Sequence, residues 1–101
     1  MSQHCNVIIN FNFNNENELK QLVPHLKELG LVTKNSSAFV SAKFHTNEAK
    51  TVLINYATYK SVEEYNKLWE EEVTKLDVYK KILSFNPVFD VVFEKSVSEL
   101  G

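Results

Sequence analysis

The sequence predicts a single α+β domain, residues 1–101, with the element order βαββαβ. Its 101 residues are 44% hydrophobic and 12% aromatic, with only two Gly and two Pro, which indicates one core and no linker. Four short segments carry the alternating or continuous apolar pattern of strands, and two longer segments carry the apolar spacing of amphipathic helices. The order of these segments predicts the fold class.

The first two elements are a strand and a helix. Residues 6–13 begin as a continuous apolar run and then alternate between polar and apolar, as in a strand. From Glu16 onward the apolar residues follow helical spacing, at Leu19, Leu22, Val23, Leu26 and Leu29. Gly30 is typical of a helix end, and Pro24 predicts a kink or a break because proline lacks a backbone donor.

The next two elements form a hairpin. Residues 38–45 and 50–59 have strand character, and the intervening residues 46–49 form the turn. In the first of these strands, alternation predicts two faces: Val40, Ala42 and Phe44 on one, and Phe39, Ser41, Lys43 and His45 on the other. The second strand is apolar on both faces, so both of its faces need cover.

The last part of the chain predicts a second helical segment and a final strand. Ser61 followed by Glu64 is a capping-box pattern. An apolar stripe follows it, at Val62, Tyr65, Leu68, Trp69, Val73 and Leu76. A further helical turn over residues 78–83 leads to Pro87 and a strand over residues 88–94, which is again apolar on both faces.

This element order is the split βαβ, ferredoxin-like arrangement, an antiparallel four-stranded sheet with both helices on one face. The opposite face would then expose an apolar patch larger than monomers usually tolerate. We therefore expect a homodimer in which two copies pack through this sheet face.

Charge and composition exclude several classes of partner and site. The net charge is −2 and all eleven basic residues are Lys, which argues against a nucleic-acid partner and leaves no guanidinium. The longest apolar runs are strand-sized, so no membrane association is expected. A single cysteine, Cys5, and an N-terminus without signal-peptide features favour a cytoplasmic protein, with Cys5 a buried or edge thiol.

The sequence does not indicate a cofactor or a metal. Gly30 and Gly101 are the only glycines, so the chain has no glycine-rich phosphate loop. The three histidines, His4, His25 and His45, lack metal-ligand spacing. We therefore expect no cofactor and no metal ion.

A group of polar and aromatic residues around Asn55 is the main candidate site. Asn55 and Tyr59 are four residues apart on a strand, hence on one face, with apolar neighbours. If this face meets the helices, the amide could orient a ligand oxygen, with Tyr59 and Tyr65 supplying hydroxyls in an aromatic pocket that includes Trp69. The alternative is that Asn55 bonds to neighbouring backbone or water and that the aromatic residues are ordinary core.

The same region resembles the antibiotic biosynthesis monooxygenase family. The family pattern is a GFVSA-x-x-H strand, a hairpin and an NYAQW-x-S-x-E-x-Y strand-to-helix stretch. This chain has SAFVSAKFH at 37–45 and NYATYKSVEEY at 55–65. The likeness is close over residues 37–69, and the flanking elements agree in order and length. It implies a dimeric ferredoxin-like α+β barrel.

The resemblance also implies a function, cofactor-independent oxygenation of a small aromatic or quinol-type substrate whose anion itself reduces O₂. Carried over by position, Asn55 would polarise a substrate or peroxy oxygen and Tyr65 would hydrogen-bond a phenolic group. Tyr59, Trp69 and His45 would contact the substrate, although a strand-end His can equally be structural or exposed. Tyr59 stands where the family usually has Trp, which replaces an indole N–H with a hydroxyl.

Two other functions are compatible with the sequence. The change to Tyr59 and the lack of Arg are compatible with a non-catalytic small-molecule-binding dimer of the same fold. A haem-binding or haem-degrading relative would use a His on the later helical segment, but residues 77–85 contain none. Tyr79 could ligate iron in principle, although its spacing does not single it out.

Overall fold

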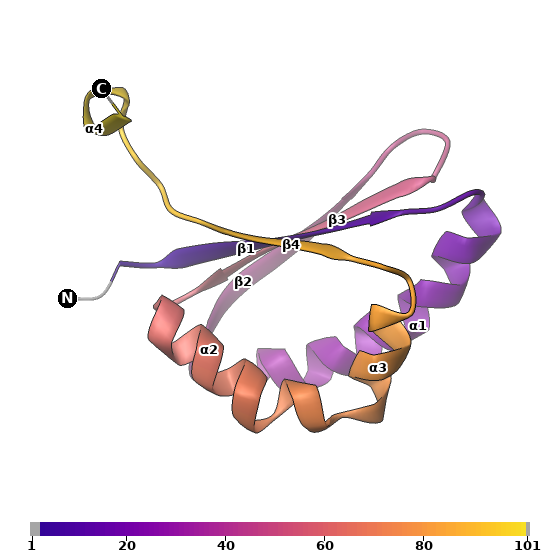
Figure 1. Cartoon of the computed structure of the whole chain (residues 1–101), viewed down its shortest axis with the longest axis horizontal. Coiled ribbons are helices and arrows are strands. Elements are labelled where there is room, and N and C mark those ends of the chain that lie inside the picture. Colours follow the sequence, from indigo (N-terminus) through magenta and orange to yellow (C-terminus); the bar gives the residue numbers. More distant parts are fainter. Residues whose placement is uncertain (1–2, 101) are drawn as a thin grey trace.

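The computed structural model describes residues 3–100 as one antiparallel sheet with its three longer helices against one face and a short C-terminal helix apart from them (Figure 1). The strands are β1 (Cys5–Asn12), β2 (Phe39–Thr46), β3 (Val52–Tyr59) and β4 (Val88–Val92), in the sheet order β2-β3-β1-β4. The helices are α1 (Glu16–Lys34), α2 (Val62–Glu71), α3 (Asp77–Leu83) and α4 (Val97–Leu100), with a 3₁₀ turn at Val73–Lys75. This confirms the predicted ferredoxin-like α+β fold. Within residues 3–100, no helix has the length and apolarity needed to cross a membrane.

Helix α1 is longer than its sequence pattern predicts. Its N-cap is Asn15, whose Oδ1 accepts a hydrogen bond from the Glu18 backbone N–H at 3.1 Å. The helix then runs without a break through Pro24 and Gly30 to Lys34. The predicted end at Gly30 is therefore wrong, and of the kink or break predicted at Pro24 the break does not occur. Packing outweighs both local signals, because the helix buries a continuous stripe: Leu19, Leu22, Leu26, Leu29 and Thr33.

The core lies between the helices and the central strand β1. Alternate β1 side chains are buried, as the period of two requires: Cys5, Val7, Ile9 and Phe11. On the helix side, fully buried Leu22 and Ile82 come from α1 and α3. Ser61 forms the N-cap of α2, since its hydroxyl accepts a hydrogen bond from the Glu64 backbone N–H at 3.1 Å. The Glu64 carboxylate returns to the Ser61 hydroxyl, which donates to it at 3.4 Å, and this replaces the backbone bond of the predicted capping box.

An irregularity in β2 changes one predicted face. Phe39 pairs with Tyr59 and Ser41 pairs with Thr58, so Val40 is an extra residue in this ladder. Such a bulge reverses the alternation on one side of the extra residue. Phe39 therefore shares a sheet face with Phe44, contrary to the simple alternation that the sequence predicts.

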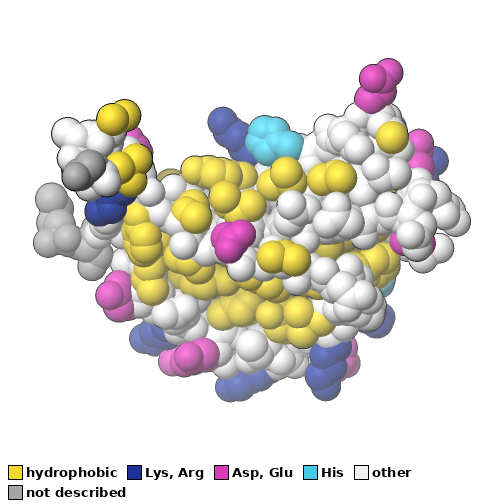
Figure 2. Space-filling model, turned by 45° about the horizontal axis from the view of Figure 1, so that its top comes forward, with side chains coloured by type: hydrophobic (Ala, Val, Ile, Leu, Met, Phe, Trp, Pro, Cys, Tyr) yellow, Lys and Arg dark blue, Asp and Glu magenta, His cyan; other side chains and the backbone are white. Residues whose placement is uncertain are grey.

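The sheet face opposite the helices is apolar over much of its area. The register places Ile8, Ile54 and Tyr56 on this face, together with Val88 and Val92 of β4. Val88 is 58% exposed, and hydrophobic side chains form a broad surface in Figure 2. Asn10 lies between Ile54 and Val88, and its Oδ1 is buried without a hydrogen-bond partner among the described residues. We refer to this surface as the open face.

Gly30 provides a direct test of the long α1. A methyl group placed on Gly30 would meet no atom within 4 Å. Replacing a mid-helix glycine with alanine removes the entropic cost of glycine, so Gly30→Ala should raise the free energy of unfolding by about 1 kcal/mol. Urea denaturation measures this difference. An unchanged or lower stability would contradict the continuation of α1 beyond residue 30.

Candidate functional site

A cavity of about 1130 Å³ lies between α1 and the half of the sheet formed by β2 and β3. Its walls are mainly apolar, with Val23 and Leu26 from α1, Phe39 and Phe44 from β2, and Leu53 and Ala57 from β3. Phe44 is 51% exposed, so the cavity reaches solvent at the edge strand β2. An apolar space of this size with a few polar groups is typical of small-molecule sites.

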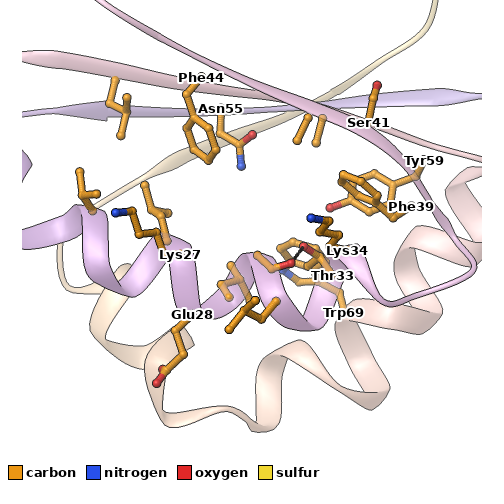
Figure 3. A pocket seen from close by; sticks show the side chains of 18 residues that line it. Lys27, Glu28, Thr33, Lys34, Phe39, Ser41, Phe44, Asn55, Tyr59 and Trp69 are labelled. Atoms are coloured by element: carbon orange, nitrogen blue, oxygen red, sulfur yellow. Dashed lines mark hydrogen bonds between the residues drawn. The ribbon is translucent and has the colours of Figure 1, made fainter.

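Asn55 is the polar group on the sheet wall of this cavity. It pairs with Ile9 on one side and Phe44 on the other, which fixes it on the helix-facing side of β3. Its amide nitrogen points into the cavity (Figure 3), and its Oδ1 is buried with no hydrogen-bond partner among the described residues. A buried acceptor without a hydrogen-bond partner lowers the free energy of unfolding by about 1–3 kcal/mol, so the Asn55 amide does not stabilise the fold.

Tyr59 forms the aromatic wall next to Asn55. Its side chain is only 3% exposed, and its hydroxyl points into the cavity (Figure 3). Phe39 meets its ring edge-on, with centroids 6.0 Å apart. Burial raises the pKa of Tyr59 well above its usual value, with a smaller contribution from Cys5. The phenol is therefore neutral near pH 7, where it can donate a hydrogen bond but cannot act as a base.

Trp69 closes the α2 end of the cavity. It meets Tyr59 edge-on, with ring centroids 6.2 Å apart. Its indole Nε1–H donates a hydrogen bond to the Tyr79 hydroxyl at 3.3 Å. The ring is thereby held in place, and its polar atom is not available to a ligand.

Two predicted site residues lie elsewhere. Tyr65 does not line the cavity: it is buried behind the wall, with ring centroids 5.0 Å from Tyr59 and 4.7 Å from Trp69. The predicted direct contact of Tyr65 with a ligand therefore does not fit the protomer. His45 is exposed and pairs with Ile54, which places it on the open face. Its predicted contact with the substrate does not fit the cavity either.

Helix α1 contributes nine residues to the cavity lining, none of them predicted there, and among these are Lys27, Gly30 and Lys34. The two lysines are seven residues apart, a spacing that places them on one side of a helix. This signal was present in the sequence, but Gly30 was interpreted as the end of the helix. Lys34 lines the cavity because α1 continues beyond Gly30, so a helix that ended at Gly30 would not predict its position.

Cys5 is fully buried, and burial raises its thiol pKa. This confirms the predicted buried thiol. The part of the chain from residue 3 to residue 100 contains no group of three His, Cys, Asp or Glu side chains that could hold a metal ion.

The neutral state of Tyr59 predicts how stability depends on pH. Tyr59 and Tyr65 both have a pKa raised by burial, whereas an unfolded tyrosine titrates near pH 10. The folded chain thus holds protons that the unfolded chain releases, so the stabilisation is complete below about pH 10 and decreases as the pH rises further. Urea unfolding between about pH 8 and 11 should show a shallower decline in Tyr59→Phe than in wild type. Equal slopes would contradict the burial of an ionisable hydroxyl at this site.

Known proteins resemble the chain in structure more than in sequence. No family profile and no curated protein sequence matches it. The ActVA-Orf6 monooxygenase of Streptomyces coelicolor, solved with Nanaomycin D, is 15% identical with a TM-score of 0.76, over 94% of this chain and 90% of that one. SnoaB, a cofactor-independent oxygenase from Streptomyces nogalater, is 6% identical with a TM-score of 0.79, over 95% and 97%.

A third structure is described as a dimeric ferredoxin-like protein from an uncultured marine organism. It is 19% identical with a TM-score of 0.70, over 95% of this chain and 93% of that one. ActVA-Orf6 and SnoaB are members of the antibiotic biosynthesis monooxygenase family. At these identities the likeness establishes the fold, and this chain has the ferredoxin-like fold that members of the antibiotic biosynthesis monooxygenase family adopt.

Proposed function

We propose that this protein is a cofactor-independent monooxygenase that acts on a small phenol or dihydroquinone bound in the cavity. The observation that carries the proposal is Asn55, an amide directed into an apolar cavity from a strand position where it has no structural partner for its Oδ1. The structural likeness to two oxygenases supports the reaction class. A non-catalytic binding protein of the same fold would lack the reaction but could share the cavity.

The proposed reaction uses the substrate as the source of all electrons. The phenol loses its hydroxyl proton, and the electron-rich ring carbon of the anion bonds to O₂. The resulting peroxy anion takes up one proton from solvent to become a hydroperoxide. Its O–O bond then breaks: one oxygen stays on the ring as a carbonyl, and the other leaves as hydroxide, which becomes water with the proton that the ring carbon gives up. One phenol and one O₂ thus become one quinone and one water, so no external reductant is needed.

The cavity residues would bind the substrate and stabilise the negative charge on its oxygen atoms. The Asn55 amide N–H and the neutral Tyr59 hydroxyl can donate hydrogen bonds to the phenolate oxygen or to the peroxy group. Among residues 3–100, Glu28 is the only carboxylate that lines the cavity, and Figure 3 shows it directed away from the sheet. The substrate proton is therefore released to solvent. Tyr65 would act as a positioning residue that holds Tyr59 and Trp69 in place.

Removal of the Asn55 amide tests this assignment. Asn55→Ala should lower the rate of O₂ uptake with a dihydroquinone by about a hundredfold, the typical loss when one donor to a developing oxyanion is removed. Its free energy of unfolding should equal or exceed that of wild type, because a buried acceptor without a partner is removed. Asn66→Ala, an exposed amide on α2, is the matched control. Unchanged turnover in Asn55→Ala would remove this residue from the mechanism.

We further propose that the open face packs against a second copy of the chain. An apolar sheet face needs cover, and the buried Oδ1 of Asn10 in its middle needs a donor that the described part of the protomer does not supply. The same patch on a two-fold related copy provides both. The structural likeness to a dimeric ferredoxin-like protein agrees with this assembly.

A charge on the open face should separate the copies. Val88 is 58% exposed in the protomer, so Val88→Glu should fold normally yet bury an unpaired carboxylate in the dimer. We expect wild type to sediment as a dimer and Val88→Glu as a monomer at micromolar concentration. Asn66→Glu adds the same charge on exposed α2 and should remain dimeric. A wild-type monomer would refute the proposed assembly.

A further inference from the structure

The α1 wall of the cavity carries two lysines that face the sheet. Lys27 and Lys34 are two helical turns apart, about 10 Å along the axis, and Figure 3 shows both ammonium groups on the sheet side of α1. Neither forms an ion pair: the one pair within residues 3–100 joins Lys20 to Glu16 at 3.0 Å. Both side chains are exposed, so the rim of the cavity carries two positive charges without an ion-pair partner among residues 3–100, in a chain whose net charge is −2.

The polar groups directed into the cavity have a common chemistry. Lys27, Lys34, the Asn55 amide nitrogen and the Tyr59 hydroxyl can all donate hydrogen bonds. The hydroxyl of Thr33 is already used, since it donates to the Gly30 carbonyl at 3.4 Å. Because no carboxylate is directed into this space among the described residues, a ligand that fits it must supply acceptors and negative charge.

Gly30 leaves room for a flat ligand between the two lysines. It lies three residues after Lys27 and four before Lys34, hence on the same side of α1. A Cβ at Gly30 would meet nothing within 4 Å, so the helix backbone borders open space there. Across that space, Phe44 and Leu53 of the sheet provide an apolar wall.

We propose that the ligand of this cavity is an amphipathic anion, with a flat aromatic body over Gly30 and one permanently ionised acid group at the α1 rim, in the combined positive field of Lys27 and Lys34. This inference rests on the proposed function, whose substrate it specifies as an aromatic acid. The acid group binds at the α1 rim through charge-assisted hydrogen bonds, where the lysine stems cover apolar surface and the ammonium groups stay hydrated. The hydroxyl-bearing ring is then directed toward Asn55 and Tyr59.

Two fluorescent probes of nearly the same shape test the charge preference. Anilinonaphthalene sulfonate is an aromatic anion, and phenylnaphthylamine has the same rings without the acid group. The double variant Lys27→Met/Lys34→Met should weaken binding of the sulfonate about tenfold and change binding of the neutral probe by less than about twofold. Methionine keeps the length and the apolar contacts of the lysine stem.

Lys20→Met is the matched control. It removes the same charge from the same helix, seven residues before Lys27, but Lys20 does not line the cavity. Sulfonate affinity should be unchanged in this variant. An equal loss in Lys20→Met would mean that general charge, and not the cavity, attracts the anion, and would overturn the inference.

The variant Gly30→Leu tests whether both probes bind inside the cavity. The leucine side chain would extend into the open space above the helix and should weaken both probes at least tenfold, while circular dichroism verifies the fold. Binding of either probe that is insensitive to Gly30→Leu would place the probes outside the cavity and overturn the inference.

The binding experiment contains no oxidation step, so it separates the two proposals. Charge-selective binding without O₂ uptake would support the anionic ligand and refute the oxygenase. O₂ uptake together with sulfonate binding that is unchanged in the double lysine variant would support the oxygenase and overturn the anionic ligand.

Discussion

The position of α1 over the sheet is the constraint on which the rest of this structure depends. Its buried leucines join the buried side chains of β1, the second strand from the β4 edge, in one core cluster. A single apolar stripe covers only part of a four-stranded sheet. The edge strand β2 therefore remains exposed along nearly its whole length, and the space beneath it is the cavity.

Each face of the sheet carries one buried amide oxygen that has no hydrogen-bond partner among the described residues. Asn55 lies on the helix-facing side at the cavity, and Asn10 lies on the open face between apolar neighbours. Each has a buried acceptor without a hydrogen bond, which lowers the stability of the isolated protomer. Buried polar groups that lower stability in this way are typical of functional sites. Here they lie on the two surfaces where we propose a ligand and a second copy.

The aromatic cluster gives the cavity a rigid end. Tyr59 is fixed by Phe39 on one side and by Tyr65 and Trp69 on the other, and Trp69 is itself bonded to Tyr79. The bulge at Val40 brings Phe39 into this cluster. At position 59 this chain therefore presents a hydroxyl on a well-supported ring, which favours a ligand with acceptor groups.

The sequence by itself determined the α+β class, the strand and helix order, the Ser61 cap and the common face of Asn55 and Tyr59, because these follow from local periodicity and capping. Tertiary structure decided the length of α1 and the positions of two predicted site residues. Packing of the leucine stripe allowed α1 to continue through Pro24 and Gly30. Packing of α2 placed Tyr65 behind the wall, and strand pairing placed His45 on the open face. The placement of the two cavity lysines depends on sequence and tertiary structure together. Their seven-residue spacing is a local property of the sequence, but the space that they face forms only when α1 packs across the sheet.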